Sequence, residues 1–430
     1  MSRQFDIIIV GAGASGLMAG IHAARAGAHV LILEHMDKAA KKILVTGNGK
    51  CNFTNEKQGI AYYHGKNPAF VLPALRQFGV SETLQFFEEL GIYPKKKWDA
   101  YYYPASGQAS SIAQSLLLEC KRLNVRIACN IGIREIKQTA KGFSFHTKQG
   151  DFFSNCCIIA TGGKAAKKTG SDGSGFLYIE KLGHKLTDIV PALVQLQGKQ
   201  LFLKEIAGIR ADGKVSIYIE KEKIAEDAGE LQLTEFGISG IPTFQVSRYA
   251  SFALSKGKHV FAMLDFLPEL TVEETRDLMR KRFLCFAEGK NAAQALLGLF
   301  PDKLNAVLLK EAQIPIRKPA GECSPEDLAR LAGKAKALRI DVTGTKGFDY
   351  AQVSAGGVDT SEVNPMTMES RLAPGLYFAG EVLDVDGMCG GYNLQWAWSS
   401  GYVAGKEAAS CCTAGIHNER SLHDILERGE

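Results

Sequence analysis

The start of the chain carries the apolar pattern of a strand, a helix and a second strand. Residues 5–10 are apolar and β-branched, and glycine follows them directly. Residues 14–26 are rich in small side chains with helical spacing, and residues 28–33 form a second apolar run. Because both strand segments are apolar throughout, we expect parallel strands that are buried on both faces of a sheet. This order predicts a nucleotide-binding βαβ unit.

The alternation of helices and strands continues to about residue 193. The pattern predicts helices at 81–90 and 111–123 and strands at 126–131, 143–147 and 156–160. It returns near the end of the chain, where the predicted elements are an apolar strand at 375–379 and a helix at 394–409. The first architecture therefore resumes after an insertion.

The insertion has two patterns of its own. Between residues 194 and 267 we expect short strands, such as 215–219 and 260–264, separated by glycine-containing turns. Residues 271–335 have a helical pattern, with helix-cap spacings at Thr271 and Ser324. We therefore expect a β-rich part and a small helical part.

A glycine pattern follows the first strand, where a dinucleotide-binding turn is expected. The pattern G-x-G-x-x-G occurs once in the chain and consists of Gly11, Gly13 and Gly16, with Ala14 and Ser15 inside it. Glycine allows a tight turn and close approach of a pyrophosphate, and the helix start offers amide groups to it. The alternative is a glycine-rich turn without a ligand.

An acidic residue stands where the ribose of a dinucleotide would lie. Glu34 comes 21 residues after Gly13, at the end of the second predicted strand. A carboxylate there can bind both ribose hydroxyls, and it would repel a 2′-phosphate. The sequence therefore favours FAD or NAD over NADP.

A second loop has the composition of a ligand-binding segment. Residues 46–52, T-G-N-G-K-C-N, are dense in glycine and amide side chains, which suits a backbone folded close to a ligand, although a plain surface turn is the alternative. Lys50 within this segment and Lys42 before it could reach phosphate oxygens.

Together with Glu34, the segment K-K-I-L-V-T-G-N-G-K-C-N-F-T-N at residues 41–55 resembles a known family. The resemblance is to three-domain bacterial flavoproteins that include aminoacetone oxidase and the BaiN-like NAD(P)/FAD-dependent oxidoreductases, such as the bile-acid-inducible flavin reductases. It implies bound FAD, with contacts from Lys42, Gly49, Cys51 and Asn52.

Two later segments carry the same resemblance, A-T-G-G at 160–163 and G-L-Y-F-A-G-E at 375–381. The carboxyl ends of parallel strands face the ligand crevice, so Glu381 or Asp386 could bind ribityl hydroxyls. Residues 390–395, G-G-Y-N-L-Q, open the last helix, and its amides would favour negative charge near the pyrimidine end of a reduced flavin. The complete set of predicted FAD contacts is Gly11, Gly13, Ala14, Ser15, Gly16, Glu34, Lys42, Gly47, Gly49, Cys51, Asn52, Ile133, Thr161, Gly162, Gly380, Glu381, Asp386, Gly391, Asn393 and Leu394.

The resemblance covers residues 5–196 and 350–405, and residues 233–240 match the family's inserted domain. The predicted fold class is α/β, with a two-segment Rossmann-type FAD-binding domain, an inserted β-rich domain and a small helical subdomain. The predicted boundaries are 1–193 and 353–430 for the FAD-binding domain, 194–270 and 336–352 for the β-rich domain, and 271–335 for the helical subdomain.

Several side chains have two interpretations. Cys51 and Cys389 could be redox partners of the flavin, but neither has the close cysteine partner that disulfide reductases use. Tyr392 and Trp396 could face the flavin ring or fill the core. Cys156 and Cys157 lie in an apolar strand and are expected in the core. The sequence identifies no general acid or base.

The composition of the chain bears on which kinds of binding partner are expected. The chain has 430 residues and a net charge of +5, which gives little reason to expect a nucleic-acid or membrane partner, and the lysines at 95–97 suit an ordinary surface. No apolar run is long enough to span a membrane, and ten cysteines without a C-x-x-C pair suit reduced thiols, so we expect a soluble cytoplasmic protein. The histidine spacing supports no metal site. The oligomeric state is not predicted.

The predicted function is redox catalysis through FAD on a small-molecule substrate. A reductase that uses NAD(P)H as a transient co-substrate is the first choice, and an oxidase that transfers electrons from an amine or aminoketone to O2 is the second. An FAD-dependent tRNA-modifying protein is an alternative of another class, and a nucleotide-binding protein with a structural role is a further one.

Overall fold

The computed structural model describes residues 3–98 and 100–428, and the chain forms two compact units. The larger unit combines Met1–Ile189 with Val353–Glu430, and the smaller unit comprises Val190–Gln352. The chain thus leaves the larger unit once and returns to it. The four-part domain division given above stays a prediction.

In the described part of the chain, a seven-stranded sheet forms the centre of the larger unit. The strand order is β7-β2-β1-β10-β9-β8, and β19 also pairs with β10. Its strands are β1 (Gln4–Val10), β2 (Val30–Leu33), β7 (Arg126–Ala128), β8 (Ile133–Thr139), β9 (Gly142–Thr147), β10 (Phe152–Ile159) and β19 (Leu376–Phe378). β1 is parallel to β2 and β10.

Strand β10 joins the two sequence segments of the larger unit. Its first residues pair antiparallel with β9, where Phe152 lies opposite Phe145, and its last residues pair parallel with β19, where Cys157 lies opposite Leu376. Cys156 and Cys157 are buried, which confirms their predicted place in the core. The carboxyl ends of β1, β10 and β19 therefore lie at the same edge of the sheet.

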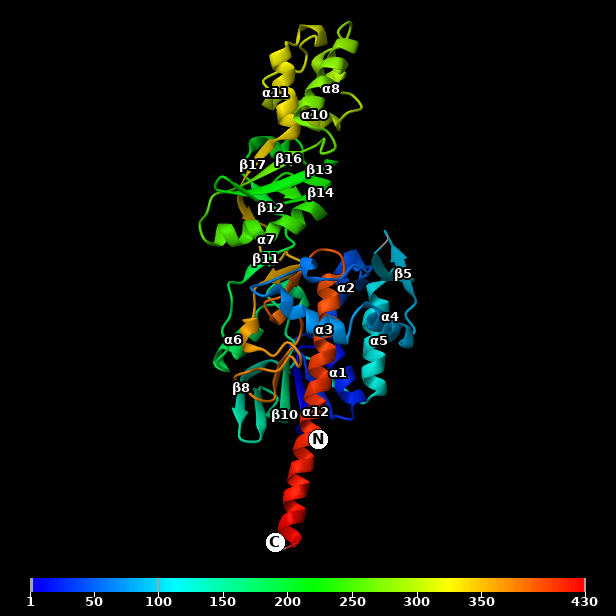
Figure 1. Cartoon of the computed structure of the whole chain (residues 1–430), viewed down its shortest axis with the longest axis vertical. Coiled ribbons are helices and arrows are strands. Elements are labelled where there is room, and N and C mark those ends of the chain that lie inside the picture. Colours follow the sequence, from blue (N-terminus) through cyan, green and yellow to red (C-terminus); the bar gives the residue numbers. More distant parts are fainter. Residues whose placement is uncertain (1–2, 99, 429–430) are drawn as a thin grey trace. The chain divides into compact units, whose positions relative to one another are not determined.

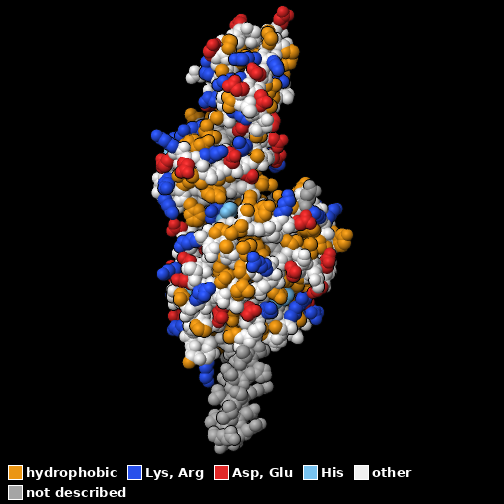
Figure 2. Space-filling view, in the orientation of Figure 1, with side chains coloured by type: hydrophobic (Ala, Val, Ile, Leu, Met, Phe, Trp, Pro, Cys, Tyr) orange, Lys and Arg blue, Asp and Glu red, His pale blue; other side chains and the backbone are white. Residues whose placement is uncertain are grey.

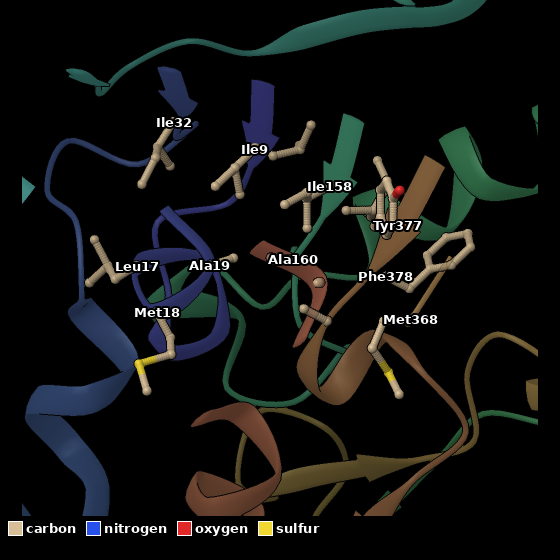
Figure 3. Packing of buried hydrophobic residues seen from close by; sticks show 14 of the residues in the cluster. Ile9, Leu17, Met18, Ala19, Ile32, Ile158, Ala160, Met368, Tyr377 and Phe378 are labelled. Atoms are coloured by element: carbon tan, nitrogen blue, oxygen red, sulfur yellow. The ribbon is translucent and has the colours of Figure 1, made fainter. Parts of the chain in front are cut away.

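Helices of the larger unit lie beside this sheet (Figure 1). They are α1 (Ala14–Arg25), α2 (Lys41–Val45), α3 (Leu72–Gln77), α4 (Val80–Glu89), α5 (Ala109–Arg122), α6 (Ser174–Lys181) and α12 (Tyr392–Arg428). Of these, α1 and α12 contact the strands of the sheet. Leu17 and Met18 of α1 belong to the same buried cluster as Ile9, Ile32 and Ile158 of the strands (Figure 3).

Glycines allow α1 and α12 to lie in close contact. A Cβ atom on Gly401 would stand 2.6 Å from the carbonyl oxygen of Ser15, and one on Gly405 would stand 2.2 Å from that of Ala19. These two glycines are four positions apart and so share one face of α12. Their close approach fixes the last helix against the helix that follows the glycine turn.

Two small sheets complete the larger unit. β3 (Thr54–Asn55), β6 (Tyr101–Pro104) and β5 (Pro94–Lys97) form one antiparallel sheet, and β4 (Tyr63–His64) pairs with β20 (Asp386–Gly387) in the other. β18 (Val353–Ala355) opens the second segment.

The smaller unit contains a closed barrel of β12-β15-β14-β13-β16-β17. The strands of this unit are β11 (Val190–Ala192), β12 (Leu196–Gly198), β13 (Arg210–Ile219), β14 (Glu222–Thr234), β15 (Gly237–Ser239), β16 (Val260–Asp265) and β17 (Leu338–Thr345). Its helices are α7 (Ile241–Ser255), α8 (Val272–Cys285), α9 (Ala292–Ala295), α10 (Asp302–Glu311) and α11 (Pro325–Lys336). One buried cluster extends from the barrel to α8, α10 and α11.

The prediction of short strands throughout residues 194–267 is wrong in two respects. The strands β13 and β14 have 10 and 13 residues, and the 15-residue helix α7 lies between β15 and β16. Helix α7 begins after Gly240 with Pro242 in its first turn, and it buries polar Thr243, Ser247 and Ser251 together with Val246. Because small polar side chains occupy its buried face, it has no clear apolar stripe in the sequence.

The predicted fold class is confirmed, since a Rossmann-type, mostly parallel sheet built from two segments accompanies an inserted barrel and a group of helices. In the residues that the structure describes, no helix combines the length and the apolar character needed to cross a membrane.

Candidate functional site

The glycine turn after β1 is packed tightly on one side and open on the other. A Cβ atom on Gly16 would stand 1.9 Å from the carbonyl oxygen of Gly11, and one on Gly11, where φ is +104°, would stand 2.5 Å from that of Ala160. Apart from its two chain neighbours, no atom of the described residues lies within 4 Å of a Cβ atom placed on Gly13. Ala14 begins α1, and the residue at its N-cap, Gly13, has no side chain to cap the first turn. The open side therefore offers amide groups to an anion.

The carboxylate of Glu34 is buried beside this turn. Its Oε2 accepts a hydrogen bond from the amide of Ala12, and its Oε1 accepts one from the amide of Met36, both at 2.8 Å. Only 8% of the residue is exposed. Each oxygen of a carboxylate has a second lone pair, so this fixed group can still accept hydroxyl hydrogen bonds.

The ends of β10 and β19 lie against the glycine turn. The Ser15 hydroxyl donates a hydrogen bond to the carbonyl of Ala379 over 3.2 Å. A Cβ atom on Gly380, where φ is +79°, would stand 2.5 Å from that hydroxyl oxygen. Thr161 follows β10, and its buried Oγ1 has no hydrogen-bond partner in the described residues. Gly162 is next to it, with φ +71°.

Lys42 and Glu381, which the sequence suggested separately, form an ion pair. The Lys42 Nζ lies 2.7 Å from Oε2 of Glu381, and it also donates to the carbonyl of Ala165 at 3.3 Å. The other oxygen of Glu381 accepts a hydrogen bond from the amide of Ser354 at 2.8 Å. Each charge is thus neutralised by protein groups before any ligand is considered.

Ser354 and Gly163 are members of this cluster that the sequence-based contact set lacked. A Cβ atom on Gly163 would stand 2.6 Å from Oγ of Ser354 and 2.7 Å from Oε1 of Glu381. Gly163 could have been found from the sequence, because it is the second glycine of the A-T-G-G segment. Ser354 had none, because it lies in a three-residue strand without a motif.

The loop after α2 has the unusual backbone that its composition suggested. Gly47, Asn48 and Cys51 have φ values of +55°, +53° and +55°. Asn52 follows, and its buried Oδ1 has no hydrogen-bond partner in the described range. A Cβ atom on Gly391 would stand 3.1 Å from this oxygen. The loop and the start of α12 therefore meet at an unsatisfied acceptor.

The side chain of Asn393 is used within the protein. Its Oδ1 accepts a hydrogen bond from the amide of Gly387, and its Nδ2 donates one to the carbonyl of Gly387, both at 2.8 Å. The backbone amides of Asn393 and Leu394 lie in the first turn of α12 and are available to a ligand without breaking these bonds. Asp386 is buried directly before Gly387.

Ile133 and Gly49 are two further predicted contacts. The carbonyl of Ile133, the first residue of β8, accepts a hydrogen bond from the Tyr178 hydroxyl at 2.6 Å, and the amide of nearby Ile131 donates to the carbonyl of Glu34. Gly49 has only the Leu44 carbonyl near the position of a Cβ atom, at 3.9 Å.

Three side chains with two interpretations are part of the packed interior. Burial raises the pKa of Cys51 to about 12, so its thiol stays protonated, which disfavours a thiolate redox partner. Trp396 donates a hydrogen bond from Nε1 to the carbonyl of Gly380, and Tyr392 stacks on Tyr62 with ring centroids 4.8 Å apart. Both rings are buried.

These features fit FAD. The open, uncapped start of α1 beside a buried carboxylate suits the adenosine and pyrophosphate part. In the described residues, the buried Asn52 Oδ1 and the buried Thr161 hydroxyl have no hydrogen-bond partner within the protein.

Comparison with known proteins gives a consistent result. The model of the family described as "HI0933-like protein Rossmann domain" matches residues 5–407. A 3-dehydro-bile acid delta(4,6)-reductase of Clostridium scindens is 45% identical over 93% of this chain and 98% of its own. The ribosomal RNA dihydrouridine synthases of Escherichia coli and Haemophilus influenzae are 30% and 29% identical over 94% of this chain and 98% of theirs.

Proposed function

Because this chain belongs to the HI0933-like Rossmann-domain family and is an FAD-dependent oxidoreductase, we propose that it reduces a carbon–carbon double bond conjugated to a carbonyl group, with NAD(P)H as the electron donor. Family membership confirms the resemblance that the segment at residues 41–55 suggested. The donor and the type of double bond are the proposed parts.

The names of the relatives support one type of reaction. A delta(4,6)-reductase removes ring double bonds of a 3-oxo compound, and a dihydrouridine synthase adds two hydrogen atoms to uridine. In both products a hydride and a proton have been added across a carbon–carbon double bond that a nearby carbonyl group activates. The balanced reaction is that of the unsaturated substrate, NAD(P)H and a proton to the saturated product and NAD(P)+.

The residues of the larger unit would have separate roles in holding FAD. The amides after Gly13 would bind the pyrophosphate, and Glu34 would bind the ribose of the adenosine. Asn52 and the first-turn amides of α12 would hold the polar edge of the ring. Bound FAD supplies the two-electron carrier between the donor and the substrate.

A single observation carries the cofactor part of this proposal. A start of α1 without a side-chain cap, open beside Gly13, lies next to a carboxylate that two backbone amides hold in place. This arrangement has a positive end for a diphosphate and an acceptor for a ribose, as a dinucleotide requires.

The test is an anaerobic titration of the purified flavoprotein. We expect NADH or NADPH to bleach the flavin absorbance, and a compound with a 3-oxo-4,6-diene to restore it, with one of its two double bonds reduced for each equivalent of donor. Bleaching by amines or aminoketones but not by nicotinamides, followed by reoxidation with O2, would instead support the oxidase.

A second candidate is the reduction of uridine in RNA. It is favoured by the 30% identity to the Escherichia coli enzyme over 94% of this chain, and the lysines of β5 are compatible with it. Incubation with an unmodified ribosomal RNA transcript and NADPH, followed by mass analysis for dihydrouridine, separates this candidate from the small-molecule reductase.

A further inference from the structure

One face of the hairpin formed by β5 and β6 carries aromatic and basic side chains. In the antiparallel register, Lys95 lies opposite Tyr103 and Lys97 lies opposite Tyr101. Residues opposite one another in such a pair point to the same side, as do residues two positions apart. Lys95, Lys97, Tyr101 and Tyr103, with Trp98 from the turn, are called the Trp98 face below.

The rings of this face are in contact with one another. The Trp98 ring lies edge-on to Tyr101 and Tyr103, with centroid distances of 5.8 and 6.2 Å. The Lys97 Nζ is 5.1 Å from the centroid of the Tyr103 ring. Three rings and an ammonium group therefore form one continuous surface.

Trp98 is unusual in both exposure and backbone. The residue is 74% exposed, and its φ of +48° lies in the left-handed region that non-glycine residues rarely adopt. In Figure 2, hydrophobic and basic side chains lie together over the position of β5 in Figure 1. An exposed tryptophan held at a strained backbone is a costly arrangement that a binding role would explain.

The Trp98 face borders the proposed FAD site. A Cβ atom on Gly390 would stand 2.8 Å from Cε1 of Tyr101, and the same glycine accepts a hydrogen bond from Asn55. A Cβ atom on Gly47 would stand 3.8 Å from Cε1 of Tyr103. The two tyrosines thus contact both glycine segments that are proposed to hold the flavin.

We propose that the Trp98 face is the substrate-binding surface, and that its ligand is a small molecule with a planar conjugated enone ring and a carboxylate. The ring stacks on Trp98 and the tyrosines, and the carboxylate lies against Lys97. This inference rests on the proposed function and adds the place and the charge of the substrate.

The charges favour a small molecule over a nucleic acid. The third lysine of the strand, Lys96, belongs to the opposite side and forms an ion pair with Glu56. The Trp98 face itself thus presents two ammonium groups, those of Lys95 and Lys97. This is enough positive charge for a ligand with one carboxylate, whereas a nucleic-acid surface generally neutralises several phosphates.

The test is calorimetric binding to the oxidised flavoprotein. The ligands are the carboxylate of a 3-oxo-4,6-diene bile acid and its methyl ester. We expect Trp98→Ala to weaken binding of both about tenfold, as the loss of one aromatic stacking contact would. Lys97→Ala should weaken binding of the acid about tenfold and leave the ester unchanged. Lys148→Ala, an exposed lysine in the turn between β9 and β10, is the matched control and should bind both ligands as the wild type does.

Three results would overturn the inference. In the first, the Trp98 and Lys97 variants bind both ligands as tightly as the wild type does. In the second, the wild-type protein binds neither ligand. In the third, a uridine oligonucleotide binds through Lys97 and the bile acid does not bind. The flavin spectrum of each variant shows whether the cofactor site is intact. If the wild type turns over the dienone and the Trp98 and Lys97 variants bind it as the wild type does, the proposed surface is refuted and the proposed function stands. If the variants show the expected loss of binding but the wild type gives no turnover, the surface stands and the proposed function is refuted.

Discussion

The Ser15 hydroxyl donates a hydrogen bond to the carbonyl of Ala379, although 364 positions separate the two residues. This contact joins the glycine turn of the first segment to the end of β19 in the second. Gly380 follows Ala379 directly, and a side chain at this position would clash with the same hydroxyl. Both segments must therefore be in place before the proposed FAD site is complete.

Two glycines of the turn should respond differently to alanine. Gly16→Ala would place a Cβ atom 1.9 Å from the carbonyl oxygen of Gly11, so we expect the apoprotein to lose about 1–3 kcal/mol of unfolding free energy. The new Cβ atom of Gly13→Ala would meet no atom of the described residues within 4 Å apart from its chain neighbours, and the backbone there is extended, so the apoprotein should keep its stability. Its methyl group would stand where a pyrophosphate approaches, and FAD affinity should fall about tenfold.

Urea unfolding of the apoproteins and FAD titration measure both effects. An apoprotein with Gly13→Ala that is as unstable as the Gly16 variant, or that binds FAD as the wild type does, would contradict the assignment of the open side.

Asn52 should have opposite effects on stability and on cofactor binding. Its buried Oδ1 has no partner in the described residues, so Asn52→Leu removes an unsatisfied acceptor and keeps the number and branching of the side-chain heavy atoms. We expect the apoprotein to be unchanged or about 1 kcal/mol more stable, and FAD to bind about tenfold more weakly. Thermal unfolding with and without FAD measures the two quantities. Equal FAD affinity in both proteins would show that Asn52 is no ligand.

The pair of Lys42 and Glu381 should show energetic coupling. Removing one partner leaves the other charge partly buried, so a double-mutant cycle with Lys42→Met and Glu381→Gln should give about 1–2 kcal/mol. The exposed pair of Lys41 and Asp37, with a similar distance of 2.8 Å, is the control and should give no more than about 0.5 kcal/mol. Urea unfolding of the apoproteins gives the coupling energies. Equal coupling energies in the two cycles would show that burial does not strengthen the pair of Lys42 and Glu381.

Glu119 should make stability depend on acid pH. The hydrogen bond from Arg122, with a further contribution from Arg25, lowers the pKa of this buried carboxyl from 4.5 to about 2. A lowered pKa stabilises the folded state fully above pH 4.5, and this contribution is lost as the pH falls towards 2. Glu119→Gln should therefore cost about 2 kcal/mol at neutral pH, allowing for the exposure of Arg122.

The difference between wild type and Glu119→Gln should disappear as the pH approaches 2. Glu135, whose pKa the hydrogen bond with Lys137 also lowers, is the exposed control, and Glu135→Gln should differ from the wild type much less than Glu119→Gln does at neutral pH, because water screens this pair. Denaturant unfolding across the pH series measures this, and a difference that persists at the lowest pH would exclude the carboxylate as its source.

The sequence by itself determined the local parts of this protein. Apolar runs and a glycine spacing predicted the strand, turn and helix at the start. The observed α1 differs from the predicted 14–26 by one residue at its end, and α4 differs from the predicted 81–90 by one residue at each end. The same local signals placed Gly11, Gly13 and Gly16 in one turn and Glu34 beside it. They succeed because backbone conformation and strand burial depend on residues close together in the chain.

Only the tertiary structure decided which distant residues meet. Lys42 pairs with Glu381 across 339 positions, Ser354 joins them without any motif, and Tyr101 reaches Gly390 from another small sheet. Helix α7 escaped the pattern because its buried side is partly polar. These features depend on packing between segments far apart in the chain, and hydrophobic periodicity records that a side chain is buried but not which side chain it will meet.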